Sequence, residues 1–180
     1  MEDASFTQLE TARLVIRRFR EVDAALLTAY RNDPAVARYQ GWETPYTERQ
    51  AAEFIASLRD LPPGRTNTWF QFAVESGESG FLIGDVALRT TPEDPGQGEL
   101  GFSFAVAHQG RGYAAEAARA VIDYAFTRLR MRRIVAVTAL RNVQAQRLLE
   151  RIGFGLRKKI GEEALVYEQL ASQSEPPRAS

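Results

Sequence analysis

The feature that most constrains this chain is a change of hydrophobic periodicity at a glycine-rich segment. Apolar residues alternate with polar or small ones over residues 99–106, which predicts a β-strand. The sequence HQGRGYA follows at residues 108–114, and apolar side chains then recur every three or four residues up to Leu129, which predicts a helix. The short apolar run IVAVT at residues 134–138 predicts the next strand. The second half of the chain therefore alternates strands with helices.

The remaining elements follow from periodicity, caps and breakers. In the first half we expect a strand at residues 13–19 and a helix that begins at 23 and is stopped by Pro34. We then expect a second helix from 47 to about 60, followed by a hairpin whose strands are residues 70–74 and 81–88. In the second half we expect a helix capped by Asn142 and ended by Gly153, and strands beginning at 154 and 165. An antiparallel first half thus precedes the alternating second half, within an α/β (α+β) fold.

The length of 180 residues fits one domain with an ordinary core. We expect an N-terminal arm at residues 1–8, a single domain at 9–170 and a polar, disordered tail at 171–180, where the sequence is ASQSEPPRAS. The arm is acidic and polar and resembles no signal peptide. No apolar run approaches the roughly 18 residues of a membrane span. A cytoplasmic protein that binds no membrane is the expectation.

Composition excludes several kinds of chemistry. The chain has no cysteine, so it has no disulfide, no thiolate ligand and no cysteine nucleophile. Its one histidine, His108, rules out a site with several histidine ligands and therefore argues against a zinc enzyme. The formal net charge of zero gives no electrostatic footprint for nucleic acid.

The glycine-rich segment has the properties of an anion site. The first turn of a helix carries free N–H groups and a partial positive charge, and glycines let phosphate oxygens approach the backbone. Arg111 adds a cation beside Gly110 and Gly112. The P-loop pattern is absent, whereas the residues Gly110, Gly112 and Ala115 fit a dinucleotide fingerprint, a weak signal alone. No acid follows about 20 residues on, as that fingerprint requires. An NAD(P)-binding oxidoreductase therefore stays only as an alternative.

Several motifs together resemble one family. They are, in order, TARLVIR at 11–17, ELGF at 99–102, QGRGYAAEA at 109–117 and Asn142 with RLLERIGF at 147–154. The pattern of Gln109, Gly112 and Ala114 is similar to the acetyl-CoA motif of the GNAT N-acetyltransferase superfamily. The set resembles its RimJ/RimL branch, which acetylates the N-termini of ribosomal proteins. The resemblance covers roughly residues 10–170.

The resemblance implies a fold and a binding mode. The fold would be a mixed, mostly antiparallel twisted sheet flanked by helices, whose central parallel strands at 99–106 and 134–138 splay apart. Acetyl-CoA would be the co-substrate, without a metal. The pantetheine arm would lie in the split, and the pyrophosphate on the backbone of residues 109–114. The residues implied to bind the donor are Phe104, Val106, Gln109, Gly110, Arg111, Gly112, Tyr113, Ala114 and Asn142. The family often forms dimers, so a homodimer is possible.

The residues suggest two candidates for the general base that takes a proton from the amine. Glu99 points to the face opposite Leu100 and Phe102, and it is our first candidate; a solvated carboxylate is the plain alternative. His108 is the second candidate, because histidine titrates in the useful range. The family often carries a tyrosine as the general acid, and the matching position in this sequence is Leu149. The general acid is therefore unassigned; Tyr113 and Tyr167 are candidates, and each could equally have a packing role.

The chemistry of the amine favours an α-amine acceptor slightly. A lysine amine with a pKa near 10.4 costs about 3.5 kcal/mol more to deprotonate at pH 7 than an α-amine near 7.8. The expected partners are therefore acetyl-CoA and a peptide N-terminus or a small primary amine. Aromatic residues at 39, 42, 46 and 69 lie where the acceptor would bind, although core positions are equally consistent with them. A non-catalytic acyl-CoA-binding module is a further alternative.

Overall fold

The computed structural model describes residues 1–171 and contains one sheet of eight strands. The sheet has the order β1-β2-β3-β4-β5-β6-β8-β7. The strands are β1 (Gln8–Glu10), β2 (Leu14–Arg17), β3 (Trp69–Ser76), β4 (Leu82–Thr90), β5 (Gln97–Phe104), β6 (Arg133–Ala139), β7 (Gly155–Ile160) and β8 (Ala164–Leu170). The helices are η1 (Glu21–Asp23), α1 (Ala24–Asn32), α2 (Pro34–Ala37), α3 (Glu48–Leu58), η2 (Val106–His108), α4 (Tyr113–Thr127) and α5 (Val143–Arg151).

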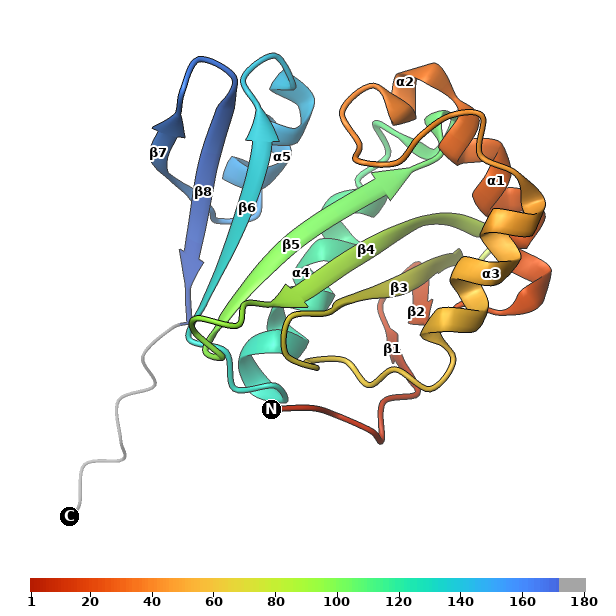
Figure 1. Cartoon of the computed structure of the whole chain (residues 1–180), viewed down its shortest axis with the longest axis horizontal. Coiled ribbons are helices and arrows are strands. Elements are labelled where there is room, and N and C mark those ends of the chain that lie inside the picture. The colour runs from red at the N-terminus through yellow and green to blue at the C-terminus, as the bar shows by residue number, and fades with distance from the viewer. Residues whose placement is uncertain (172–180) are drawn as a thin grey trace.

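The sheet splits along the one pair of strands, β5 and β6, that is parallel within residues 1–171. β5 and β6 are paired only from Gln97↔Arg133 to Glu99↔Val135, and all other neighbours are antiparallel. Beyond Glu99 the two strands diverge, and β6, β8, β7 and α5 lean away from the rest of the sheet (Figure 1). The expected mixed sheet with splayed parallel strands is confirmed. The split leaves one edge of β5 without a strand partner beyond Glu99.

Helices cover both faces of the larger part of the sheet. α4 packs on one face against alternate residues of the strands, such as Phe70, Phe72 and Leu100. α1 and α3 cover the other face, where Ala73 and Leu82 are buried. The period-two pattern of the strands produces both layers, because successive side chains point to opposite faces. α4 is consequently held with its first turn beside the end of β5.

Most expected boundaries differ from the structure by one or two residues, and the end of β5 differs in a way that affects the cavity. The strand expected to reach Val106 ends at Phe104, and residues 106–108 form a 3₁₀ turn in which Val106 is 45% exposed. The ladder to β4 ends with the bond from the Ala105 N–H to the Ile83 carbonyl. With β6 already diverged, no strand remains to pair residues 106–108. Local bonds such as His108 N–H to the Ala105 carbonyl replace the ladder.

The N-terminal arm is part of the domain. Phe6 is buried, and its ring lies 5.2 Å from that of Phe72. The expected arm ends one residue too late, because Gln8 already belongs to β1, a strand of three residues that is too short to show alternation. The tail predicted to be disordered lies, beyond Ala171, outside the described residues. In residues 1–171 no helix is long and apolar enough to cross a membrane.

Candidate active site

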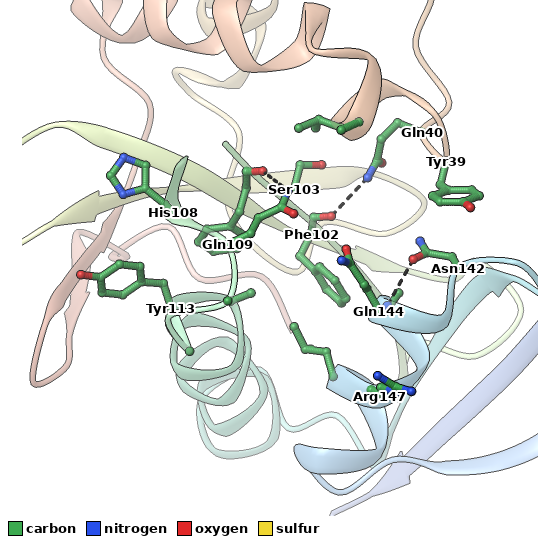
Figure 2. A pocket seen from close by; sticks show the side chains of 18 of the residues that line it. Tyr39, Gln40, Phe102, Ser103, His108, Gln109, Tyr113, Asn142, Gln144 and Arg147 are labelled. Carbon is green, nitrogen blue, oxygen red and sulfur yellow. Dashed lines mark hydrogen bonds between the residues drawn. The ribbon is translucent and has the colours of Figure 1, made fainter. Parts of the chain in front are cut away.

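A cavity of about 330 Å³ opens where the sheet splits. Four parts of the chain contribute to its walls: the end of β5, the start of α4, the first turns of α5 and the segment after α1 (Figure 2). The lining residues are Ala35, Val36, Tyr39, Gln40, Phe102, Ser103, Phe104, His108, Gln109, Gly110, Gly112, Tyr113, Ala114, Asn142, Gln144, Ala145, Arg147, Leu148 and Arg151.

The glycine-rich segment forms one wall of this cavity and presents backbone donors to it. Gly110 and Gly112 have φ angles of +74° and +84°, a backbone conformation that residues with a Cβ rarely adopt. Gly112 is the N-cap of α4, so the helix begins at Tyr113. Within residues 1–171, no acceptor bonds the N–H groups of residues 110–112. Free N–H groups and a helix dipole at one place are the features that favour anion binding.

The free edge of β5 forms a second wall. The carbonyls of Phe102 and Phe104 point to this edge, since Gln40 Nε2 donates to the first at 3.3 Å and Gln109 Nε2 to the second at 2.8 Å. The N–H of Ala105, by contrast, donates to the carbonyl of Ile83 in β4. Alternate residues of a strand bond opposite neighbours, so the N–H groups of Phe102 and Phe104 face the open edge as well. Since both carbonyls already accept from glutamine side chains, this edge offers chiefly the two N–H groups to the carbonyls of an extended ligand.

The start of α5 forms the facing wall. Asn142 caps the helix through its side-chain oxygen, which accepts from the Ala145 N–H at 3.2 Å. The cap places Gln144 and Arg147 at the cavity, opposite His108 and Tyr113 (Figure 2). Arg147 and Arg151 add positive charge near the anion site. The amide-rich edge and the cationic end suit a ligand with a polar arm and phosphate groups.

Most of the residues expected to bind the donor meet at this cavity. Phe104, Gln109, Gly110, Gly112, Tyr113, Ala114 and Asn142 all line it. Val106 does not line it, because the strand ends before it. The exposed Arg111 is also not among the lining residues, and its carbonyl accepts a bond from Arg13 Nη1 at 3.0 Å.

The two candidate bases lie in different surroundings. His108 lines the cavity, with its ring 6.3 Å from that of Tyr113. Glu99 does not line it; its carboxylate pairs with Arg89 at 2.5 Å, at the level where β5 and β6 are still hydrogen-bonded. Glu99 is therefore at the closed end of the split, and His108 is at the glycine-rich segment.

The tyrosines considered for the acid also separate. Tyr113 lines the cavity. Tyr167 is buried in the core, where its hydroxyl donates to Glu150 at 3.1 Å. Burial and that bond raise the pKa of Tyr167. Leu149 is 1% exposed and packs in the same core. This position therefore provides no hydroxyl that could act as the general acid.

Sequence reasoning missed residues that reach the cavity from distant elements. Gln40 and Gln144 belong to none of the motifs above, and Arg147 opens the motif RLLERIGF but is not singled out there as a ligand. Of the four aromatic residues expected near the acceptor, only Tyr39 lines the cavity, and its hydroxyl donates to the Arg141 carbonyl at 3.3 Å. Trp42 and Tyr46 instead pack around the Arg31 guanidinium, and Trp69 lies against Arg89.

The residues present fit acetyl-CoA. A Cβ added at Gly110 would have no atom within 4 Å, so the loop is open to a ligand there. The free edge of β5 suits the two amides of pantetheine, and the donors at residues 110–112 suit its pyrophosphate. Over residues 1–171, no group of three or more His, Asp or Glu side chains is placed to hold a metal.

A split sheet with a glycine-capped helix start beside it suits a protein whose ligand carries phosphates. The chain belongs to the GNAT acetyltransferase family, whose model, described as "Acetyltransferase (GNAT) domain", matches residues 13–155. An uncharacterized N-acetyltransferase of Bacillus licheniformis, named p20, is 33% identical over 148 residues, which are 81% of each chain. The family match leaves the NAD(P)-binding alternative without support.

Solved structures share the fold. The ribosomal-protein-S5-alanine acetyltransferase of Vibrio fischeri superposes with a TM-score of 0.78 at 21% identity, over 95% of this chain and 100% of that one. The spermidine N-acetyltransferase of Vibrio cholerae, in complex with CoA and spermine, superposes with a TM-score of 0.75 at 23% identity, over 89% and 96%.

Proposed function

We propose that this enzyme transfers the acetyl group of acetyl-CoA to the α-amine of a peptide N-terminus or of a small molecule. The observation that carries the proposal is the free edge of β5 at Phe102 and Phe104, next to the glycine-capped start of α4. One feature suits the amides of pantetheine and the other suits its phosphates, and they are adjacent in one cavity.

The reaction needs no covalent enzyme intermediate. A neutral amine attacks the thioester carbonyl, the C–N bond forms, the C–S bond breaks, and the thiolate of CoA takes up a proton. The amine loses its own proton to a base. Because an α-amine is partly neutral at pH 7 whereas a lysine amine is almost fully protonated, a weak base suffices for the α-amine. This supports an α-amine acceptor, as does the resemblance to the RimJ/RimL branch.

We propose Glu99 as the base, acting through water. The thioester and the pyrophosphate are at opposite ends of pantetheine. A ligand with its phosphates on residues 110–114 extends along β5 towards the closed end of the split, where Glu99 lies. His108 precedes the anion site by two residues, so we assign it to the phosphate end.

Two single substitutions test this assignment. We expect Glu99→Gln to lower kcat by about 100-fold or more with little change in KM for acetyl-CoA. We expect His108→Ala to raise KM for acetyl-CoA more than it lowers kcat. Steady-state kinetics with a peptide acceptor measures both effects. The reverse pattern, with kcat lost in His108→Ala and kept in Glu99→Gln, would make His108 the base.

Calorimetric titration of acetyl-CoA, CoA and NADP⁺ into the purified protein tests the donor. We expect both CoA compounds to bind and NADP⁺ not to bind. A thiol-release assay with peptides bearing free N-termini, the same peptides with blocked N-termini, lysine and spermidine then tests the acceptor. Turnover only with free N-termini supports the proposal. CoA binding with no turnover on any amine would instead indicate a non-catalytic acyl-CoA-binding module.

A further inference from the structure

The first motif of the chain meets the glycine-rich segment across almost 100 residues of sequence. Residues 11–13 form the turn between β1 and β2, which is closed by the bond from the Thr11 N–H to the Leu14 carbonyl. This turn lies against the first turn of α4, where Glu116 is. The reaction chemistry above uses neither Thr11, Arg13 nor Glu116.

The carboxylate of Glu116 is fully occupied by this turn. Its Oε1 accepts from the Thr11 hydroxyl at 2.6 Å and from the Arg13 N–H at 3.0 Å. Its Oε2 accepts from Arg13 Nε at 2.8 Å and pairs with Nη2 at 2.6 Å. Burial alone opposes ionisation, but the bonds from Thr11 and Arg13 outweigh it and lower the pKa of Glu116 below its usual value. The negative charge of Glu116 is therefore neutralised locally.

Arg13 also contacts the segment that precedes α4. Its Nη1 donates to the Arg111 carbonyl at 3.0 Å, and its guanidinium lies 4.5 Å from the centre of the Tyr113 ring. In a trans peptide the carbonyl and the following N–H point in opposite directions. By holding the Arg111 carbonyl on its own side, Arg13 directs the Gly112 N–H the other way. Gly112 is one of the residues that line the cavity at the split of the sheet.

We propose that Arg13 and Glu116 are positioning residues for the pyrophosphate of acetyl-CoA. Arg13 fixes the peptide between Arg111 and Gly112 so that its N–H is a donor for the phosphates. It also cancels the Glu116 charge, which would otherwise repel those phosphates from the first turn of α4. Glu116 in return holds the guanidinium in place. This inference rests on the proposed donor, acetyl-CoA. It gives residues 11–13, with the sequence TAR, a role in binding that donor.

Calorimetric titration of CoA into three variants tests the proposal. We expect Arg13→Gln and Glu116→Gln each to weaken CoA binding by about tenfold, which corresponds to about 1.4 kcal/mol. The double variant should lose little more than either single one, because the two residues act as a unit. Arg13→Lys keeps the charge but lacks the fork that reaches two acceptors, so it should restore only part of the affinity. It also serves as the test if Arg13→Gln fails to fold.

A matched control separates this role from general stability. Arg49 forms an exposed pair with Glu53 on α3 at 2.7 Å, outside the cavity, and Arg49→Gln should bind CoA as the unchanged protein does. Steady-state kinetics should show a raised KM for acetyl-CoA in Arg13→Gln, with KM for the amine unchanged. Unchanged CoA affinity in Arg13→Gln would overturn the inference. So would an equal rise in both KM values together with a lower melting temperature, which indicates a merely structural role. Failure of the unchanged protein to bind CoA would instead overturn the proposed function.

Discussion

Gly112 is the residue at which backbone conformation and the candidate site depend most directly on each other. Its φ of +84° lets the chain turn from η2 into α4, and it is also a lining residue of the cavity. A Cβ at this position would lie 3.3 Å from Arg13 Nη2, which is tighter than an ordinary contact. A side chain here therefore strains the backbone and disturbs the arginine that holds the preceding peptide.

We predict that Gly112→Ala weakens CoA binding by about tenfold or more, or about 1.4 kcal/mol per factor of ten. Gly161 provides the control, because its φ is +54° in the turn between β7 and β8 and nothing lies within 4 Å of its added Cβ. Both variants carry a backbone cost of about 1–2 kcal/mol. Calorimetry should find lost affinity in Gly112→Ala alone. Equal affinity in the two variants would contradict the placement of the pyrophosphate.

At the level of a single element, the start of α5 links stability to the site. Asn142 bonds the Ala145 N–H and lines the cavity, and the turn that it caps carries Gln144 and Arg147. Fraying of this turn moves one wall of the cavity while the sheet stays intact.

We predict that Asn142→Ala lowers the free energy of unfolding by about 1 kcal/mol and also weakens CoA binding. Thr47 caps α3 by the same kind of bond, to the Gln50 N–H at 3.2 Å, and α3 contributes no residue to the cavity. Thr47→Ala should lose similar stability but keep its affinity for CoA. Urea unfolding and calorimetry on both variants check this. Unchanged affinity in Asn142→Ala would show that the cap has no part in binding.

Across the molecule as a whole, the donor would complete an interrupted sheet. The part containing β6, β7, β8 and α5 is paired with the rest of the sheet at three positions of β5 and β6, and its inner side packs in the same core as α4 (Figure 1). A ligand in the split contacts both parts, so its binding free energy adds to the stability of their junction.

We predict that CoA at about 100 times its Kd adds about 2.7 kcal/mol and raises the melting temperature by about 5–11 °C for a chain of this size. Hydrogen exchange should slow at the Phe102 and Phe104 amides, which face the split. Exchange at the exposed Gly80 amide, in the turn between β3 and β4, should stay the same, because this turn opens without unfolding of the core. NADP⁺ is the negative control in the melting assay. Protection that is uniform over the chain would argue against binding in the split.

Residue order alone was enough to predict most of the helices and strands, and it made the glycine-rich segment a candidate anion site. Periods of two and of three to four residues report which side chains face a core, and glycines beside a helix start report a backbone open to anions. These are local properties, so the order of residues 109–114 by itself predicts a binding segment. The signal failed where it was too short, as at β1, or where a strand loses its partners, as at Val106.

Which distant residues meet could be learned only from the folded chain. The place where β5 and β6 part depends on how each packs on its own neighbours, and no local pattern encodes it. The same holds for Gln40 on the β5 edge, for Arg13 and Glu116 beside the glycines, and for Arg89 against Glu99. These contacts join residues on separate elements, and their geometry is fixed by the packing of whole elements. The local order of residues therefore indicates the chemistry, while the packing selects the side chains that surround it.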